Sequence, residues 1–224
     1  MIYVVSDIHG RGDRFASILK QIKLKAEDHL YILGDVIDRN PDGIRLLRKI
    51  AKARNMTMLL GNHEYMMLSV IDDPRDTARG DHWRVRNGGD VTWNKWKHCP
   101  KRMRAELIAW LRSLPLNIEV SCGGKDWLLV HGAPLENQGN TFDRYGDVPP
   151  DYYTVWHRLT DEEPMPEGKT VVFGHTPTHH YLDVSPMQVY HGKDRIGIDC
   201  GCAYPHGRLA CLRLDDGRIF YSKD

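Results

Sequence analysis

The chain has 224 residues, of which 41% are hydrophobic and 27% charged, a composition typical of soluble globular proteins that excludes disordered, collagen-like and disulfide-scaffold chains. Its 31 Lys and Arg residues and 30 Asp and Glu residues leave a formal net charge of +1, which excludes a general electrostatic attraction to nucleic acid or an anionic membrane. The five cysteines form an odd, sparse set and the N-terminus lacks the features of a signal peptide, so we expect a reduced, cytoplasmic protein with no membrane partner.

In the first part of the chain, short apolar segments alternate with amphipathic ones. Strands are predicted at residues 2–5, 29–33 and 56–60, and helices at 13–22 and 43–53. This alternation predicts a sheet with parallel neighbours and helices packed on it.

The second part of the chain favours short strands and tight turns. A helix is predicted at 103–114, and the following strands are expected at 116–122, 127–130, 170–173, 195–198, 209–214 and 219–222. Together the elements predict a mixed α/β (α+β) fold in which two packed mixed β-sheets, a β-sandwich, are flanked by helices.

We expect one domain over residues 1–224. Two long stretches, at about 72–102 and 135–166, are rich in Gly, Pro, Asp, Asn and aromatic residues and are expected to be irregular excursions. Long loops in compact domains are usually functional, so both are expected to border the active site.

Five predicted strands end in the same kind of sequence, an apolar run followed by a metal-capable side chain with a small residue nearby. The five segments are Ser6-Asp7-Ile8-His9, Gly34-Asp35, Gly61-Asn62-His63-Glu64, His131-Gly132 and Gly174-His175. Ligand sites of open α/β sheets lie at the carboxyl ends of the strands, so these side chains are expected to meet in one crevice. Asp, His and Asn donors without thiolates suit divalent Mn, Fe or Zn with open coordination positions.

In order and spacing, these segments resemble the signature of the calcineurin-like metallophosphoesterases, and within them the phosphoprotein phosphatase family. The resemblance runs from residue 1 to about 214 and includes Gly34-Asp35-Val36-Ile37-Asp38-Arg39. Trp83 with Asn87-Gly88-Gly89, Trp156-His157-Arg158 and Gly174-His175-Thr176-Pro177 are similar to the small bacterial and phage serine/threonine phosphatases related to bacteriophage lambda phosphatase.

The resemblance implies a cofactor of two divalent metal ions, with Mn²⁺ expected and Fe, Zn or Ni as alternatives. One ion would be held by Asp7, His9 and Asp35, and the second by Asp35, Asn62, His131 and His175. Two such ions about 3.5–4 Å apart lower the pKa of a shared water and clamp the attacking and leaving oxygens of an in-line displacement.

The resemblance also implies the catalytic groups. Arg39 and Arg158 would hold phosphoryl oxygens, as a planar fork of donors can, and Asn62 would help to bind the substrate. His63 would protonate the leaving oxygen, and Asp38 would orient its imidazole and favour the protonated form. The implied reaction is direct in-line attack on phosphorus by a metal-bound hydroxide, without a phosphoenzyme.

The sequence departs from the family pattern in two places. Asn40 replaces a Gly, and because Asn tolerates a positive φ the turn is expected to survive. Cys200 replaces a Thr. Cys200 and Cys202 with His206 are favoured as packing and surface residues over a further metal site. His157 has no assigned role and is favoured as a surface or loop residue, with a place at the border of the cleft as the alternative.

These features predict a metal-dependent phosphomonoesterase that acts on phosphorylated proteins, as a serine/threonine or dual-specificity phosphatase and as a monomer. The alternatives are a symmetrical diadenosine tetraphosphate hydrolase and a non-catalytic binding relative. Glu64 and Thr176-Pro177 favour the protein phosphatase, because the tetraphosphate hydrolases usually carry Gly-Asn-His-Asp and a different final His motif. The balanced charge disfavours a nuclease.

Overall fold

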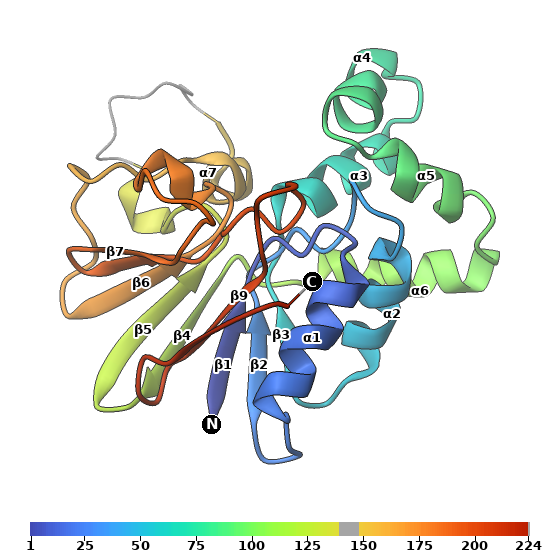
Figure 1. Ribbon diagram of the computed structural model, residues 1–224. Helices are drawn as coiled ribbons and strands as arrows, with labels where there is room; N and C mark the ends of the chain where they lie inside the picture. The colour runs from blue at the N-terminus through green and yellow to red at the C-terminus, as the bar shows by residue number, and fades with distance from the viewer. Residues whose placement is uncertain (139–147, 224) are drawn as a thin grey trace.

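The computed structural model describes residues 1–138 and 148–223, so residues 139–147 of the second expected excursion lie outside the described residues. Two five-stranded sheets make up the centre of the molecule (Figure 1). Their strand orders are β10-β9-β1-β2-β3 and β4-β5-β6-β8-β7. Each sheet contains both parallel and antiparallel neighbours, and the predicted fold class is therefore confirmed.

The strands follow the predicted order with small shifts at their ends. The first sheet contains β1 (Ile2–Val5), β2 (His29–Ile32), β3 (Met56–Met58), β9 (Ala210–Arg213) and β10 (Ile219–Tyr221). The second contains β4 (Asn117–Cys122), β5 (Lys125–Val130), β6 (Lys169–Phe173), β7 (Tyr190–Gly192) and β8 (Arg195–Gly197). The three-residue strand β7 was not predicted.

Helices lie outside the pair of sheets. Near the first sheet are α1 (Gly12–Ile22), α2 (Gly43–Lys52), α3 (Asn62–Asp72) and α6 (Lys101–Arg112), and near the second is α7 (Pro150–Trp156) (Figure 1). Two short 3₁₀ helices are found at Leu135–Asn137 (η2) and Thr178–His180 (η3).

Alternating side chains on the strands build the layers. Val4 belongs to the core between the sheets, whereas its neighbour Val5 belongs to the core under the helices. In β5, Leu129 points into the core between the sheets, and Leu128 packs in the outer core that includes Tyr153 of α7. This period of two places hydrophobic side chains on both faces of each sheet, which must then be covered on both sides.

Two expectations about the segments after β3 are wrong. Helix α3 was missed because it is buried around most of its circumference, including Met66, Met67 and Val70, and so shows little amphipathic period. The stretch at 72–102 is largely helical rather than irregular. It contains α4 (Thr77–Asp81), the π-helix η1 (His82–Arg86) and α5 (Asp90–Trp96).

Within residues 1–138 and 148–223, no helix has the length and apolar character needed to span a membrane.

Candidate active site

A small pocket of about 60 Å³ lies where the predicted ligand-bearing segments meet. Eight of the predicted site residues line it, namely Asp7, His9, Asp35, Arg39, Asn62, His63, Arg158 and His175. The other two, Asp38 and His131, are buried beside it: Asp38 Oδ2 lies 2.6 Å from His63 Nδ1, and His131 Nε2 lies 2.9 Å from Asn62 Oδ1. The structure therefore brings all ten residues together, from both sheets.

Three histidines are held by one ring nitrogen and present the other to the pocket. His9 Nδ1, His131 Nδ1 and His175 Nε2 lie 3.0, 2.6 and 3.0 Å from the carbonyl oxygens of Ile37, Leu33 and Trp156. A carbonyl only accepts, so each of these nitrogens carries the proton and leaves a lone pair on the opposite nitrogen. Burial lowers the pKa of all three rings, which keeps that lone pair available for a cation.

The available lone pairs converge in two groups that share Asp35. Asp35 Oδ2 lies 3.7 Å from His9 Nε2, and Asp35 Oδ1 lies 3.5 Å from His131 Nε2. Asn62 Oδ1 lies 2.9 Å from both His131 Nε2 and His175 Nδ1. Because the ring protons are used elsewhere, the Asn62 oxygen faces two lone pairs, an arrangement that a cation between them stabilises. The side chains that could hold a metal ion form two groups, His9 with Asp35 and His63, and Asp35 with His131 and His175, and this donor set fits two divalent cations.

The buried carboxylates also fit cations. Burial is the main cause of the raised pKa of Asp35, and the nearby Asp7 and Glu64 raise it further. Asp199, which also lines the pocket, has its pKa raised by burial and by Asp7. Asp7 itself has Oδ1 at 4.0 Å from His9 Nε2. Asp199 follows the strand predicted at 195–198, as the predicted ligands follow theirs, and this position is the sequence signal for its place in the pocket.

The backbone at the site is unusual. Six of the eight non-glycine residues with positive φ in the described ranges are site residues, at Asp7 (53°), His9 (45°), Asp35 (52°), Asp38 (71°), Arg39 (65°) and His175 (61°). Such left-handed conformations cost free energy in non-glycine residues and cluster at functional sites. Asn40 is not among them. The turn is present, as expected, but its positive φ angles belong to Asp38 and Arg39, so it does not depend on the tolerance of Asn40 for this conformation.

Glycines beside the predicted ligands allow the backbone to lie close to the carboxylates of the site. A Cβ at Gly61 would lie 2.3 Å from Asp35 Oδ1, and one at Gly174 would lie 2.3 Å from Asp7 Oδ2. Any larger residue at either position would displace a carboxylate of the site.

His63 is held between Asp38 and the pocket. Its Nδ1 lies 2.6 Å from Asp38 Oδ2, which also accepts a 2.7 Å hydrogen bond from Trp83 Nε1. Its Nε2 faces the pocket, 3.2 Å from Arg39 Nη2 and 3.8 Å from Asp35 Oδ2. This orientation places Nε2 where a leaving oxygen could take a proton.

The pKa of His63 differs from the expectation that Asp38 favours the protonated imidazole. Burial and the Arg39 guanidinium lower the pKa of His63, and burial raises the pKa of Asp38 to about 7. Asp38 therefore orients the imidazole, but in the protein by itself it does not favour the protonated form. The hydrogen bond from Trp83 to Asp38 was also missed, although Trp83 belongs to the segments that carry the resemblance.

Glu64 has a structural role that the sequence did not reveal. Its carboxylate accepts hydrogen bonds from the backbone N–H groups of Asp35, Val36 and Ile37 at 2.9, 2.9 and 3.2 Å. It thereby fixes the loop that carries the shared carboxylate, from within a helix that begins at Asn62.

The remaining predicted residues lie as follows. Arg158 donates from Nη1 to the carbonyl oxygen of His175 at 3.3 Å and lines the pocket with Arg39. His157 lies 2.9 Å from Glu163 through Nε2 and does not line the pocket. Burial raises the pKa of Cys200 and Cys202 to about 12, so both remain protonated thiols, as expected of packing residues.

Comparison with known proteins identifies the class. Residues 1–214 match the family model described as calcineurin-like phosphoesterase, and the chain belongs to this family. The two groups of Asp and His side chains that could hold a metal ion fit the divalent ions that this family implies.

Individual relatives carry two different names. A symmetrical bis(5'-nucleosyl)-tetraphosphatase of Acidovorax sp. (strain JS42) is 35% identical over 136 residues, 60% of this chain and 44% of the relative. The chain thus spans less than half the length of that relative. Serine/threonine-protein phosphatase 1 of Salmonella typhimurium (strain LT2) is 27% identical over 218 residues, 95% of this chain and 91% of its own. The solved structure of a cold-active protein-tyrosine phosphatase from Shewanella sp. shares the fold, with a TM-score of 0.61 and 20% identity over 99% of this chain and 80% of its own.

Proposed function

We propose that this chain hydrolyses symmetrical dinucleoside tetraphosphates at the site described above. The observation that carries the proposal is the local identity with curated tetraphosphatases, which is higher than that with the protein phosphatase. It supports the alternative weighed from the sequence more strongly than the favoured protein phosphatase. The phosphoprotein remains the second candidate substrate, because the Salmonella phosphatase aligns along nearly all of both chains.

The residues divide into metal ligands and substrate groups. Asp7, His9, Asp35, Asn62, His131 and His175 would hold two divalent cations, for which we propose Mn²⁺. When bound, such cations activate water as a nucleophile and neutralise charge on the phosphoryl oxygens. Arg39 and Arg158 line the same pocket and would bind the remaining phosphoryl oxygens through paired N–H groups.

His63 would supply the proton to the leaving oxygen. In the protein alone, Arg39 faces His63 Nε2 and lowers the pKa of the ring. A phosphoryl group that binds the Arg39 guanidinium would remove this effect and add negative charge, and both changes raise the pKa of His63. Water adds to phosphorus, the bond from the attacked phosphorus to its leaving oxygen breaks, and His63 Nε2 protonates that oxygen. Two nucleoside diphosphates result from a symmetrical tetraphosphate.

The experiment is a direct competition of substrates. Purified protein with Mn²⁺ is given diadenosine tetraphosphate or a phosphoserine peptide at equal concentration, with ADP and phosphate measured as products. Preferred release of ADP supports the proposal, and preferred release of phosphate from the peptide replaces it with the second candidate. Turnover of neither substrate would contradict both. An Asp35→Asn variant controls for contaminating hydrolases.

A further inference from the structure

The catalytic pocket is too small to hold a whole substrate. Its volume of about 60 Å³ is far below the range of about 300–1,000 Å³ typical of ligand sites. The pocket can take a phosphoryl group, and the rest of any substrate must lie in neighbouring space.

An aromatic hollow of about 330 Å³ adjoins the catalytic pocket. Trp156 lines both cavities and is the only one of the described residues that they share. Its backbone oxygen lies 3.0 Å from His175 Nε2, and its ring meets the His175 ring edge to face at 5.9 Å between centroids. Tyr65 comes from α3, the same helix that begins with Asn62 and His63. The hollow is therefore built on the elements that position the catalytic groups.

The walls of this hollow suit a flat ring. Tyr152 stacks on Trp156 with ring centroids 5.9 Å apart and planes at 27°, and Tyr65 meets Tyr152 edge to face at 6.0 Å. His82 lies 6.0 Å from the Trp156 ring, and the buried Met66 lines the same space. Aromatic side chains of this kind bind nucleobases by stacking, without requiring a particular base.

One charged side chain, Arg79, lines the hollow, and its Nε pairs with Asp76 Oδ2 at 3.4 Å. The buried Trp156 Nε1 has no hydrogen-bond partner among the described residues, so the side chain shared by both cavities has a donor that the protein does not use. Ser69 Oγ already donates to the carbonyl oxygen of Tyr65. A flat ring in this hollow would therefore be bound mainly by stacking on the aromatic side chains, rather than by hydrogen bonds to its edge.

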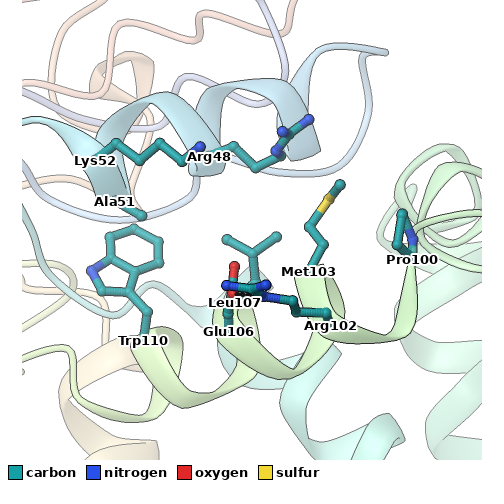
Figure 2. A pocket seen from close by; sticks show the side chains of 9 residues that line it. All are labelled: Arg48, Ala51, Lys52, Pro100, Arg102, Met103, Glu106, Leu107 and Trp110. Carbon is teal, nitrogen blue, oxygen red and sulfur yellow. Dashed lines mark hydrogen bonds and ion pairs between the residues drawn. The ribbon is translucent and has the colours of Figure 1, made fainter.

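A second hollow, of about 380 Å³, lies between α2 and α6 (Figure 2). Leu107 and Trp110 rise from α6 toward Ala51 of α2, and the hollow shares no residue with the catalytic pocket. Because this hollow is separate from the catalytic pocket, substitutions in it can serve as controls.

We propose that the aromatic hollow formed by Tyr65, His82, Tyr152 and Trp156 binds one nucleobase of a substrate whose phosphates occupy the catalytic pocket. The inference rests on the proposed function for its substrate class. It makes a nucleotide, rather than a peptide side chain, the occupant, because four of the eight lining residues are aromatic and the volume matches the smallest ligand sites.

The test compares two inhibitors that differ by a nucleoside. Hydrolysis of p-nitrophenyl phosphate is inhibited with ADP or with inorganic pyrophosphate, at a fixed free Mn²⁺ concentration. Wild-type protein should bind ADP more tightly than pyrophosphate. In Tyr152→Ala, the Ki for ADP should rise about tenfold relative to that for pyrophosphate, while Tyr152→Phe should keep most of the preference for ADP. Met103→Ala, in the hollow of Figure 2, should leave both Ki values unchanged.

Equal binding of ADP and pyrophosphate by wild-type protein would overturn the proposal, as would an equal rise of both Ki values in Tyr152→Ala. A selective rise in the KM for a phosphoserine peptide would assign the hollow to a peptide side chain instead. These readouts do not depend on turnover of diadenosine tetraphosphate. If ADP binding is selective but the dinucleotide is not hydrolysed, the hollow stands and the proposed substrate falls.

Discussion

In each of the four site histidines, one ring nitrogen is hydrogen-bonded to another group of the protein, so only the other nitrogen can bind a ligand. Backbone carbonyl oxygens accept a hydrogen bond from His9, His131 and His175, whereas the carboxylate of Asp38 accepts one from His63. A carboxylate can share or accept a proton and a carbonyl cannot. This difference separates the proposed acid from the proposed metal ligands by chemistry, although all four rings are buried.

Replacing His63 by Asn should therefore affect turnover more than metal binding. Loss of a general acid typically lowers the rate by about 10²–10⁴-fold, and the loss should be largest for alkyl phosphates, whose leaving oxygens need the proton most. Steady-state kinetics with alkyl and p-nitrophenyl phosphates measure the effect, and calorimetry with Mn²⁺ checks the metal site. Unchanged turnover of an alkyl phosphate would contradict the assignment.

Trp83→Phe tests the group behind the acid. The substitution removes one of the two donors to Asp38 Oδ2, while Asp38 Oδ1 has no partner among the described residues. We expect kcat to fall about tenfold, as for loss of one hydrogen bond of about 1.5 kcal/mol to a charged group, with little change in KM. Tyr3→Phe, remote from the pocket, is the control. A changed KM with an unchanged kcat would show that Trp83 does not act through His63.

At the scale of elements, α3 and the loop after β2 depend on each other. Helix α3 supplies Asn62 and His63, and its Glu64 carboxylate holds three N–H groups of the loop that carries Asp35. Buried backbone donors without partners are costly, so the loop keeps its left-handed residues only while this carboxylate is present.

Glu64→Ala should thus lower the free energy of unfolding by about 3 kcal/mol or more, because three buried donors lose their acceptor. Glu64→Gln keeps one acceptor oxygen and should lose less. Urea unfolding of both variants in chelator measures the effect without a contribution from metal binding. Equal stability of Glu64→Ala and the wild-type protein would show that water replaces the carboxylate.

The elements also show what could be predicted from the sequence. Strands such as 2–5 and helices such as 13–22 were found because their hydrophobic periods are local properties. The proposed metal ligands were indicated by their positions after predicted strands, whereas Asp38, Arg39 and Arg158 were implied only by the family resemblance, and the roles of all these residues remain predictions. Helix α3 was missed for lack of amphipathic period, and the role of Glu64 was missed because its partners lie 27 to 29 positions away in the chain.

On the scale of the whole molecule, the buried acidic groups oppose folding when no cation is present. Asp35 and Asp199 both have raised pKa values, caused first by burial and then by Asp7. A ligand that binds only the folded protein stabilises it in proportion to the logarithm of its concentration.

Removal of metal with EDTA should therefore abolish hydrolysis and lower the Tm, and added Mn²⁺ should restore both. A concentration 100 times the Kd stabilises by about 2.7 kcal/mol, which is several degrees in a chain of this size. Differential scanning calorimetry across a Mn²⁺ series checks this, with Mg²⁺ as a control for ionic strength. A Tm independent of Mn²⁺ would contradict a metal site in the folded protein.

The donors come from both sheets: Asp7, His9, Asp35 and Asn62 follow strands of the first, and His131 and His175 follow strands of the second. The proposed metal site would therefore join the two sheets, and residues of the N-terminal and C-terminal parts of the chain. Fragments divided in the turn between α6 and β4 would each hold only part of the donor set. Metal uptake by the mixed fragments would then report reassociation of the halves, independently of any substrate.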